Sequence, residues 1–547
     1  MKLPMLNIKI VNGTVVDGTG TKAYSADIGI ADDRIAVIGD LKHVASRITL
    51  DAAGKIVAPG FIDMHTHSDL SMLLDDTADS MLRNGVTTNL CGNCGEGIVP
   101  ISAEYQDVMV QYMRSGVIPG NYPDGYEYPW STFQEYHDYI RRNPPLINMA
   151  SLVAHGPIRM SVMGMGKGAA DERQINHMRA LVREGMEAGA FGLSTGLAYS
   201  PGDLVDQREI LEIAKPVRDF GGIYATHMRN QGEGTFASLE ETKYIGEGAG
   251  IPIHVSHLKL ADPRMWGKTE DVFRWFEQVN AAGLRATFDV YPYTRGCSGI
   301  LRLLPPWAKE GGVADTIHRL TDPEIRKSVL HDCRNGIDGW ENLAENIGWQ
   351  NVFVTSFRKA ENMGFEGLTV AQISDRLGRD PWEVYLDLVV EEEAKAGILV
   401  ASMSTADMEK IVCHPESILA SDGAAQSLRP DRNYGFQHPR AYGTQTKVLR
   451  RFVREKKLLT MEEAVKKMTS MPAELLGMKY RGKIKQGFYA DVVVFDPETV
   501  SDMSTFSDLQ RAPEGIETVI VNGILALKEG EVICKTAGRL ITKTDMA

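Results

Sequence analysis

The sequence of 547 residues lacks several features that would mark a secreted or membrane protein. Its six cysteines are too few for a disulfide framework in so long a chain, and they fit a reducing compartment. It has no apolar run of about 18 residues, the length that a membrane span requires. The N-terminal residues alternate like a strand and lack the apolar centre of a secretory signal. We therefore expect a cytoplasmic protein.

The chain also lacks an excess of positive charge. The formal net charge is −13, and no basic tail, low-complexity tract or internal repeat is present. This balance argues against nucleic acid or an anionic membrane as a partner. An anionic small molecule would need a local cluster of Arg or Lys. The oligomeric state does not follow from the sequence.

Both ends of the chain predict β-structure. The segments "NIKIVNGTVVDGTG", "GKIKQGFYADVVVFD" and "IETVIVNGILALKEGEVICK" are apolar or alternating runs punctuated by Gly, Asn and Asp. The phrase "IVNG" occurs in both halves of this set, at 10–13 and 520–523. We expect residues 1–58 and 478–547 to form one small β-sandwich domain.

Between these ends, β-prone segments alternate with helical patterns, which is typical of βα units around a parallel sheet. There are eight such segments, at 56–67, 86–95, 148–156, 189–197, 222–229, 251–259, 285–293 and 417–423. Eight repeats predict an α/β fold, a TIM (β/α)8 barrel over residues 59–477. The long excess after the seventh segment, residues 295–400, is an insertion. Barrels place substrate-facing loops there, so we interpret it as a lid, with a remote subdomain as the alternative.

Metal-competent side chains collect at the predicted C-terminal ends of five of these strands, where TIM barrels carry their functional residues. They are His65, His67, Cys94, His227, His257 and Asp422. Each alone is better explained as a core or chance residue, but the chain has only 13 His. Imidazole, thiolate and carboxylate together favour Zn²⁺ over Mg²⁺ or Ca²⁺.

The stretch "TTNLCGNCGEG" places Cys91 and Cys94 three residues apart. Such a pair could be a redox couple, half of a zinc clip, or one functional thiol beside a bystander. Cys94 falls at the end of the second predicted strand, level with the histidines. Cys91 falls inside that strand, where a cysteine packs as a small apolar residue. We predict that only Cys94 is a ligand.

Several motifs of this chain resemble those of the N-acyl-D-amino-acid deacylase (D-aminoacylase) family within the amidohydrolase superfamily. They are "APGFIDMHTHSD", "GNCG", "GLSTGLAYSPG", "THMRNQGEG", "HVSHLK", "ASDG" and "HPRAYGT". The resemblance spans nearly the whole chain except the 295–400 insertion. It implies one tightly held zinc on Cys94, His227 and His257. A second, weaker position would use His65, His67 and Asp422, with Cys94 able to bridge the two.

The resemblance implies hydrolysis of the amide bond of an N-acyl-D-amino acid. Asp422 would take the proton of water and return it to the leaving amine. "LSTG" does not match G-x-S-x-G, so a serine nucleophile has little support. The substrate carboxylate needs cations, and Arg440 and Lys259 follow two ligand strands closely. We expect Tyr199 and Tyr291 to donate hydrogen bonds to the substrate, with surface or structural roles as the alternative for all four residues.

Three rival interpretations are open. A cyclic amidase of the same superfamily, such as a hydantoinase or dihydroorotase, commonly bridges two metals with a lysine on strand four, and "GAFGLSTGL" has none. A dipeptidase that releases D-amino acids would use nearly the same ligands. A non-enzymatic scaffold would have lost ligands, whereas all six positions here are metal-competent. We expect the insertion and the loop between Asp422 and Arg440 to set acyl and side-chain preference.

Overall fold

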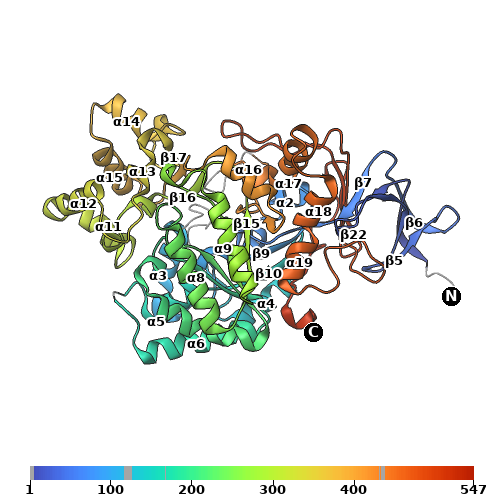
Figure 1. Cartoon of the computed structure of the whole chain (residues 1–547), viewed down its shortest axis with the longest axis horizontal. Helices are drawn as coiled ribbons and strands as arrows, with labels where there is room; N and C mark the ends of the chain where they lie inside the picture. Colours follow the sequence, from blue (N-terminus) through green and yellow to red (C-terminus); the bar gives the residue numbers. More distant parts are fainter. Residues whose placement is uncertain (1–4, 116–125, 167, 430–431, 433–437, 547) are drawn as a thin grey trace.

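The chain folds into a central barrel with a β-sandwich on one side and the insertion on the other (Figure 1). The structure is a computed structural model that describes residues 5–115, 126–166, 168–429, 432 and 438–546. Within these residues, no helix is both long and apolar enough to cross a membrane.

The barrel consists of parallel strands in chain order. They are β8 (Phe61–Asp63), β9 (Val86–Cys91), β10 (Asn148–Ser151), β11 (Val153–Ala154), β12 (Gly192–Gly196), β13 (Ile223–His227), β14 (Ile253–Val255), β15 (Ala286–Val290) and β19 (Ser417–Leu419). β10 and β11 are two parts of the third barrel strand, separated at Leu152. The first and eighth strands meet just beyond their ends, where the His67 amide donates to the Gly423 carbonyl at 2.8 Å. The predicted (β/α)8 barrel is confirmed.

The helices around the barrel have the sequence signals that helices need. α6 (Glu172–Glu187) begins with a capping box between Asp171 and Gln174, which satisfies backbone donors at its first turn. Its buried residues Ile175, Met178 and Val182 recur at helical spacing and face the barrel. The other barrel helices include α5 (His155–Met163), α7 (Gln207–Ala214), α8 (Thr235–Ala249), α9 (Thr269–Ala281), α16 (Thr405–Cys413), α17 (Arg440–Lys447), α18 (Met461–Met468) and α19 (Ser470–Leu476).

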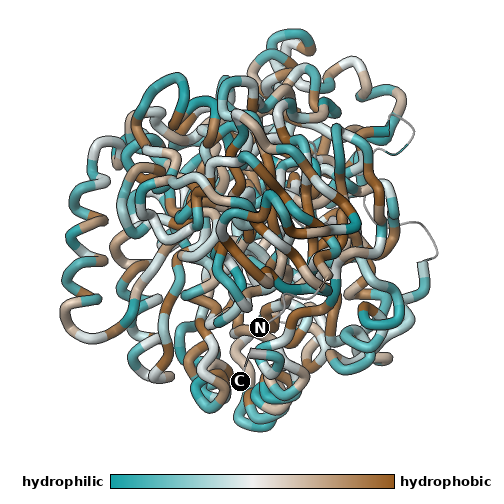
Figure 2. The backbone as a smooth tube through the Cα atoms, turned by 90° about the vertical axis from the view of Figure 1, so that its right-hand side faces the viewer, coloured by the Kyte–Doolittle hydropathy of each residue, from teal (hydrophilic) through white to brown (hydrophobic). Residues whose placement is uncertain are grey.

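The sandwich joins both ends of the chain, as predicted. One sheet has the order β5-β4-β1-β6, formed by β1 (Leu6–Val11), β4 (Asp27–Ala31), β5 (Arg34–Gly39) and β6 (Ser46–Asp51). The other has the order β23-β22-β21-β20-β7-β2-β3, formed by β2 (Thr14–Val15), β3 (Tyr24–Ser25), β7 (Ile56–Pro59), β20 (Val492–Phe495), β21 (Ile516–Val521), β22 (Ile524–Lys528) and β23 (Glu531–Val532). β7 pairs antiparallel with β20. Figure 2, which faces this side, shows hydrophobic strand segments crossing the middle of the view.

The segment 56–67 is not one strand. β7 belongs to the sandwich and β8 to the barrel, and the chain crosses between them at Gly60. A Cβ on Gly60 would lie 2.2 Å from the Thr87 side chain, so only glycine fits this crossing. The end of the chain crosses back, because the Ile541 amide donates to the Met149 carbonyl of β10 at 2.7 Å. The domain limits predicted from the sequence, 1–58 with 478–547 for the sandwich and 59–477 for the barrel, remain predictions.

The insertion after strand seven has its own hydrophobic core, which includes Leu320, Val329, Val352, Trp382 and Tyr385. Its antiparallel sheet has the order β16-β18-β17, from β16 (Gly296–Gly299), β17 (Val352–Thr355) and β18 (Gly397–Val400). Its helices are α10 (Pro306–Lys309), α11 (Val313–Thr321), α12 (Pro323–Asn335), α13 (Leu343–Ile347), α14 (Val370–Leu377) and α15 (Pro381–Glu391). Figure 1 shows it projecting from the barrel opposite the sandwich.

Candidate metal centre

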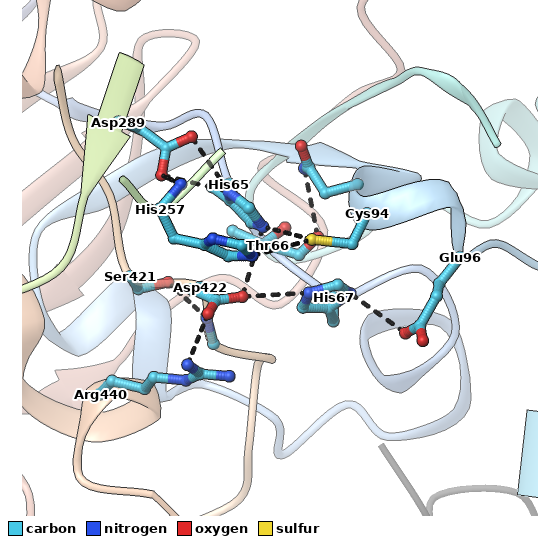
Figure 3. Close-up of polar contacts among 12 residues, drawn as sticks. His65, Thr66, His67, Cys94, Glu96, His257, Asp289, Ser421, Asp422 and Arg440 are labelled. Carbon is cyan, nitrogen blue, oxygen red and sulfur yellow. Dashed lines mark hydrogen bonds and ion pairs between the residues drawn. The ribbon is translucent and has the colours of Figure 1, made fainter. Parts of the chain in front are cut away.

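Four side chains from four strand ends meet around one thiol. Cys94 Sγ lies 3.1 Å from His65 Nε2 and 3.4 Å from His257 Nε2, and His65 Nε2 lies 3.3 Å from Asp422 Oδ1. The ligand atoms of these four residues all lie within 4.8 Å of one another, and all four residues are buried (Figure 3). The barrel has brought together residues more than 300 positions apart.

The other two predicted ligands lie beside this group. His67 Nε2 is 3.2 Å from Asp422 Oδ1, and its Nδ1 is 3.8 Å from Glu96 Oε2. The His227 ring lies edge-on to the His257 ring, with 4.4 Å between centroids. All six predicted ligands therefore surround one site, although His67 and His227 fall outside the tightest set of four.

The backbone is bent where three of the ligands sit. Cys94, His257 and Asp422 have φ values of 55°, 36° and 52°, a region that non-glycine residues rarely adopt. Such strain persists only where the surroundings fix it, and it is concentrated at functional sites. Here it turns three side chains from separate strand ends toward the same point.

The loop that carries Cys94 is held by strand β12. The Gly95 amide donates to Ser194 Oγ at 3.0 Å, and Ser194 donates to the Gly92 carbonyl. Gly95 has a φ of 67°, and a Cβ there would lie 2.5 Å from the Gly196 nitrogen. The Tyr199 hydroxyl donates to the Cys94 carbonyl at 2.8 Å. Ser194 therefore holds the loop that carries the Cys94 thiol and is not a nucleophile. The hydroxyl of Tyr199 also holds this loop.

Asp289 on β15 orients two histidines. Its Oδ2 lies 3.0 Å from His65 Nδ1, which leaves His65 Nε2 facing Cys94, and its Oδ1 accepts from the His257 amide at 2.8 Å. His254 Nε2 is a further partner at 2.8 Å. Burial opposes ionisation, but His65 and His254 hold the pKa of Asp289 below its ordinary value. A carboxylate behind a ligating histidine is the usual support of a zinc site.

A second pair of groups contacts the far side of His257. Lys259 Nζ lies 2.8 Å from His257 Nδ1 and donates to Gln231 Oε1 at 3.1 Å. Burial lowers the pKa of Lys259 to about 8. Asp422 is held in turn by Arg440, whose Nη1 donates to Asp422 Oδ2 at 2.5 Å.

The pKa shifts divide the predicted ligands into two sets. In one set they favour the form that binds a metal, and in the other they favour the protonated form. Burial raises the pKa of Cys94, but His65 and His257 outweigh it and hold that pKa well below the ordinary value. Burial and the neighbouring His257 lower the pKa of His227 to about 3. Thiolate and neutral imidazole are the forms that bind a metal. Burial likewise favours neutral His67, but Asp422 and Cys94 raise its pKa to about 10.

The donor set fits zinc. Thiolate, imidazole and carboxylate are its usual ligands, and the ligand atoms of His65, Cys94, His257 and Asp422 lie close enough to one another to share a metal ion. The carboxylate behind His65 provides the support that such ions require. An all-oxygen shell for Mg²⁺ or Ca²⁺ cannot be built from these residues.

The site opens into a cavity of about 600 Å³. Its barrel wall includes His67, Cys94, His227, His257 and Asp422, and Tyr199, Lys259 and Tyr291 lie on the same wall. The insertion supplies the opposite wall through Cys297, Ser298, Arg302, Glu341 and Val400. The insertion therefore borders the site, as a lid would. Of the loop between Asp422 and Arg440, residues 430–431 and 433–437 lie outside the described residues.

Some supporting residues were not predicted. Asp289 lies inside the apolar segment "RATFDVYPY", and an acid in such a strand needs buried partners, which is a signal that the sequence offered. Ser194 and Gln231 gave no comparable signal, because their partners come from other strands. Cys91 is buried with its Sγ 3.7 Å from Thr66 Oγ1, apart from the ligand cluster.

The chain matches the model of the "Amidohydrolase family" over residues 49–525. It is 31% identical over 538 residues to D-aminoacylase of Alcaligenes xylosoxydans xylosoxydans, covering 98% of each chain. It is 32% identical over 519 residues to N-acyl-D-glutamate deacylase of the same organism, covering 95% of this chain and 93% of the relative. A solved structure of N-acyl-D-glutamate deacylase from Bordetella bronchiseptica, with zinc and a phosphonate mimic of the tetrahedral intermediate, covers 98% of this chain and 100% of its own, with a TM-score of 0.81 and 29% identity.

The two cysteines of "GNCG" and its preceding strand should differ in zinc binding. Cys94→Ala removes the thiol at the centre of the ligand cluster and is expected to lose the stoichiometric zinc. Cys91→Ala is the matched control, expected to keep zinc and to lose about 1 kcal/mol of stability. Metal analysis and urea unfolding of both purified variants measure this. Equal zinc loss in the two would contradict the assignment.

Proposed function

Because the chain belongs to the amidohydrolase family, we propose that it hydrolyses N-acyl-D-amino acids with zinc, giving a carboxylate and a free D-amino acid. The observation that carries this proposal is one cavity lined by zinc-competent residues and the buried cation Lys259, with a second buried cation, Arg440, bound to Asp422 in its wall. An N-acyl amino acid offers a polar amide carbonyl and a carboxylate a few bonds apart. The cavity offers a partner for each.

In this proposal Cys94, His227 and His257 hold the tight zinc, and His65, His67 and Asp422 hold the weaker position, with Cys94 able to bridge. When bound, zinc supplies a Lewis acid that polarises the amide carbonyl and makes water acidic enough to ionise near neutral pH. This arrangement needs no lysine to bridge two metals, and β12 contains no lysine. Its absence favours linear amides over cyclic amides as substrates.

Asp422 is the proposed proton carrier. Its carboxylate is ionised, because Arg440 and His65 overcome the effect of burial and hold its pKa well below the ordinary value. It lies at the centre of the site, between His65, His67 and Arg440. It takes the proton of the attacking water and then delivers it to the amine that leaves.

Lys259, Arg440 and Tyr291 are proposed to receive the substrate carboxylate. The Lys259 ammonium and the Arg440 guanidinium lie 5.4 and 5.2 Å from the centre of the Tyr291 ring, so the three groups lie together, and Lys259 and Tyr291 line the cavity. Tyr199 contributes at the other side of the site, where its ring lies 5.0 Å from the His227 ring. Its proposed role is to shape the cavity while its hydroxyl holds the Cys94 loop.

The reaction is tested by paired assays of N-acetyl-D- and N-acetyl-L-amino acids, with and without added zinc. Turnover of the D series, dependent on zinc and removed by a chelator, is the expected result. D-amino acid release from dipeptides in the same assay would measure the dipeptidase alternative. Stoichiometric zinc without turnover of any of these substrates would contradict the proposed function.

Asp422→Asn should lower kcat about 10²- to 10⁴-fold, the usual contribution of a positioned proton acceptor. The zinc held by Cys94, His227 and His257 should remain. Asp502→Asn is a control that also removes a carboxylate bound to arginine, Arg450 at 2.6 Å, but away from the cavity. If the Asp422 variant retains zinc and near-native turnover, Asp422 is not the proton carrier.

Arg440→Lys should raise KM for N-acyl-D-amino acids about 10- to 100-fold, because a lysine cannot reproduce the paired donors of a guanidinium. The corresponding acyl amides, which lack the carboxylate, should be affected little. Steady-state kinetics on both substrate series separates KM from kcat. A fall in kcat with equal effects on both series would assign Arg440 to holding Asp422 instead.

A further inference from the structure

A second cavity of about 700 Å³ adjoins the metal cavity. The two share Tyr199, Ser298 and Arg302 in their walls. Its remaining walls come from α3 (Gln106–Ser115), from Met165 just after α5, from Glu96 and Ser200, and from the start of the insertion. None of the six predicted metal ligands lines this second cavity, so it is open to another part of a substrate.

The lining of this second cavity suits an uncharged, apolar group. Val108, Met165, Leu301 and Val313 contribute apolar side chains from four separate segments. Its two cations are already paired within the protein. Lys309 Nζ lies 2.6 Å from Asp203 Oδ2, and Arg302 donates to Glu341. A second carboxylate on the substrate would therefore find no unpaired cation among these two.

The position of the cavity relative to the metal cluster identifies which part of the substrate reaches it. Lys259 and Arg440 lie on one side of the cluster, against His257 and Asp422. Glu96, which lines the second cavity, lies on the other side, 3.8 Å from His67. Figure 3 shows Arg440 and Glu96 at opposite ends of the Asp422–His67 pair.

An N-acyl amino acid is divided in the same way. Its carboxylate lies on the nitrogen side of the amide and its acyl chain on the carbonyl side. With the carboxylate at Lys259 and Arg440 and the amide at the cluster, the acyl chain points past Tyr199 into the second cavity. The two cavities thus match the two halves of the substrate.

We propose that the second cavity is an acyl-group site, and that this chain acts on N-acyl-D-amino acids with a bulky apolar acyl group, such as a medium-chain fatty acyl group, in preference to acetyl. The proposal rests on the deacylase function proposed above. Burial of each added methylene should raise kcat/KM about two- to fourfold until the cavity is filled. An acetyl group would leave most of the cavity without substrate contacts.

The test is a series of N-acyl derivatives of one D-amino acid, from acetyl through butanoyl and hexanoyl to octanoyl, assayed for kcat/KM with the wild-type zinc enzyme. A steady rise with chain length is the expected result. Equal or falling values from acetyl onward would overturn the acyl site. Absence of hydrolysis throughout the series, acetyl included, would instead contradict the deacylase function itself, so the two failures are distinguishable.

Two tryptophan variants test whether the dependence on acyl-chain length arises in this cavity. Val313 lines it at the start of α11, and Ala314, the next residue, is exposed. Val313→Trp should reduce the octanoyl-to-acetyl ratio of kcat/KM roughly tenfold by occupying the cavity, and Ala314→Trp should leave that ratio unchanged. A parallel series of substrates keeps the acetyl group and varies the amino-acid side chain. If Val313→Trp alters the side-chain series and not the acyl series, the cavity serves the side chain and the proposal is wrong.

Discussion

Burial of ionisable groups around the Cys94 thiol is the constraint on which the rest of the site depends. Each buried charge costs several kcal/mol unless a partner compensates it. The structure supplies such partners for two of them, Asp289 for His65 and Arg440 for Asp422, whereas burial and the neighbouring Lys259 lower the pKa of His257 and favour its neutral form. The buried ligands therefore depend on these outer groups, which set their charge states.

Those partners come from different strands, so the charge network requires a closed barrel. Asp63 shows the dependence most directly. Its Oδ1 accepts from the Ser421 amide at 3.0 Å and from the His65 amide at 3.3 Å, which links the eighth strand to the first beside the ligands. Its other oxygen accepts from Gln445. A barrel left open between these strands would separate His65 and His67 from Asp422, and the cluster would not form.

Much of this site followed from the sequence because barrel topology places strand ends together. The H-x-H spacing of His65 and His67, and the place of Cys94 after a strand, were sufficient to predict residues of one centre. An acid inside the apolar strand signalled that Asp289 has buried partners, but the identity of those partners, His65 and the His257 amide, is not encoded in any local pattern. The hydroxyl of Tyr199 was expected to face the substrate and instead holds the Cys94 loop.

The insertion was recognised as an interruption of the barrel, but its connection to the metal centre is visible only in three dimensions. Glu341 accepts from the Gln231 amide at 3.0 Å and binds Arg302, which borders both cavities. The side chain of Gln231 in turn contacts His257 and Lys259. A short series of contacts thus joins the wall shared by the two cavities to His257 and Lys259. Changes within the insertion can alter the cavities without touching the ligands, provided that Glu341 and Gln231 remain in place.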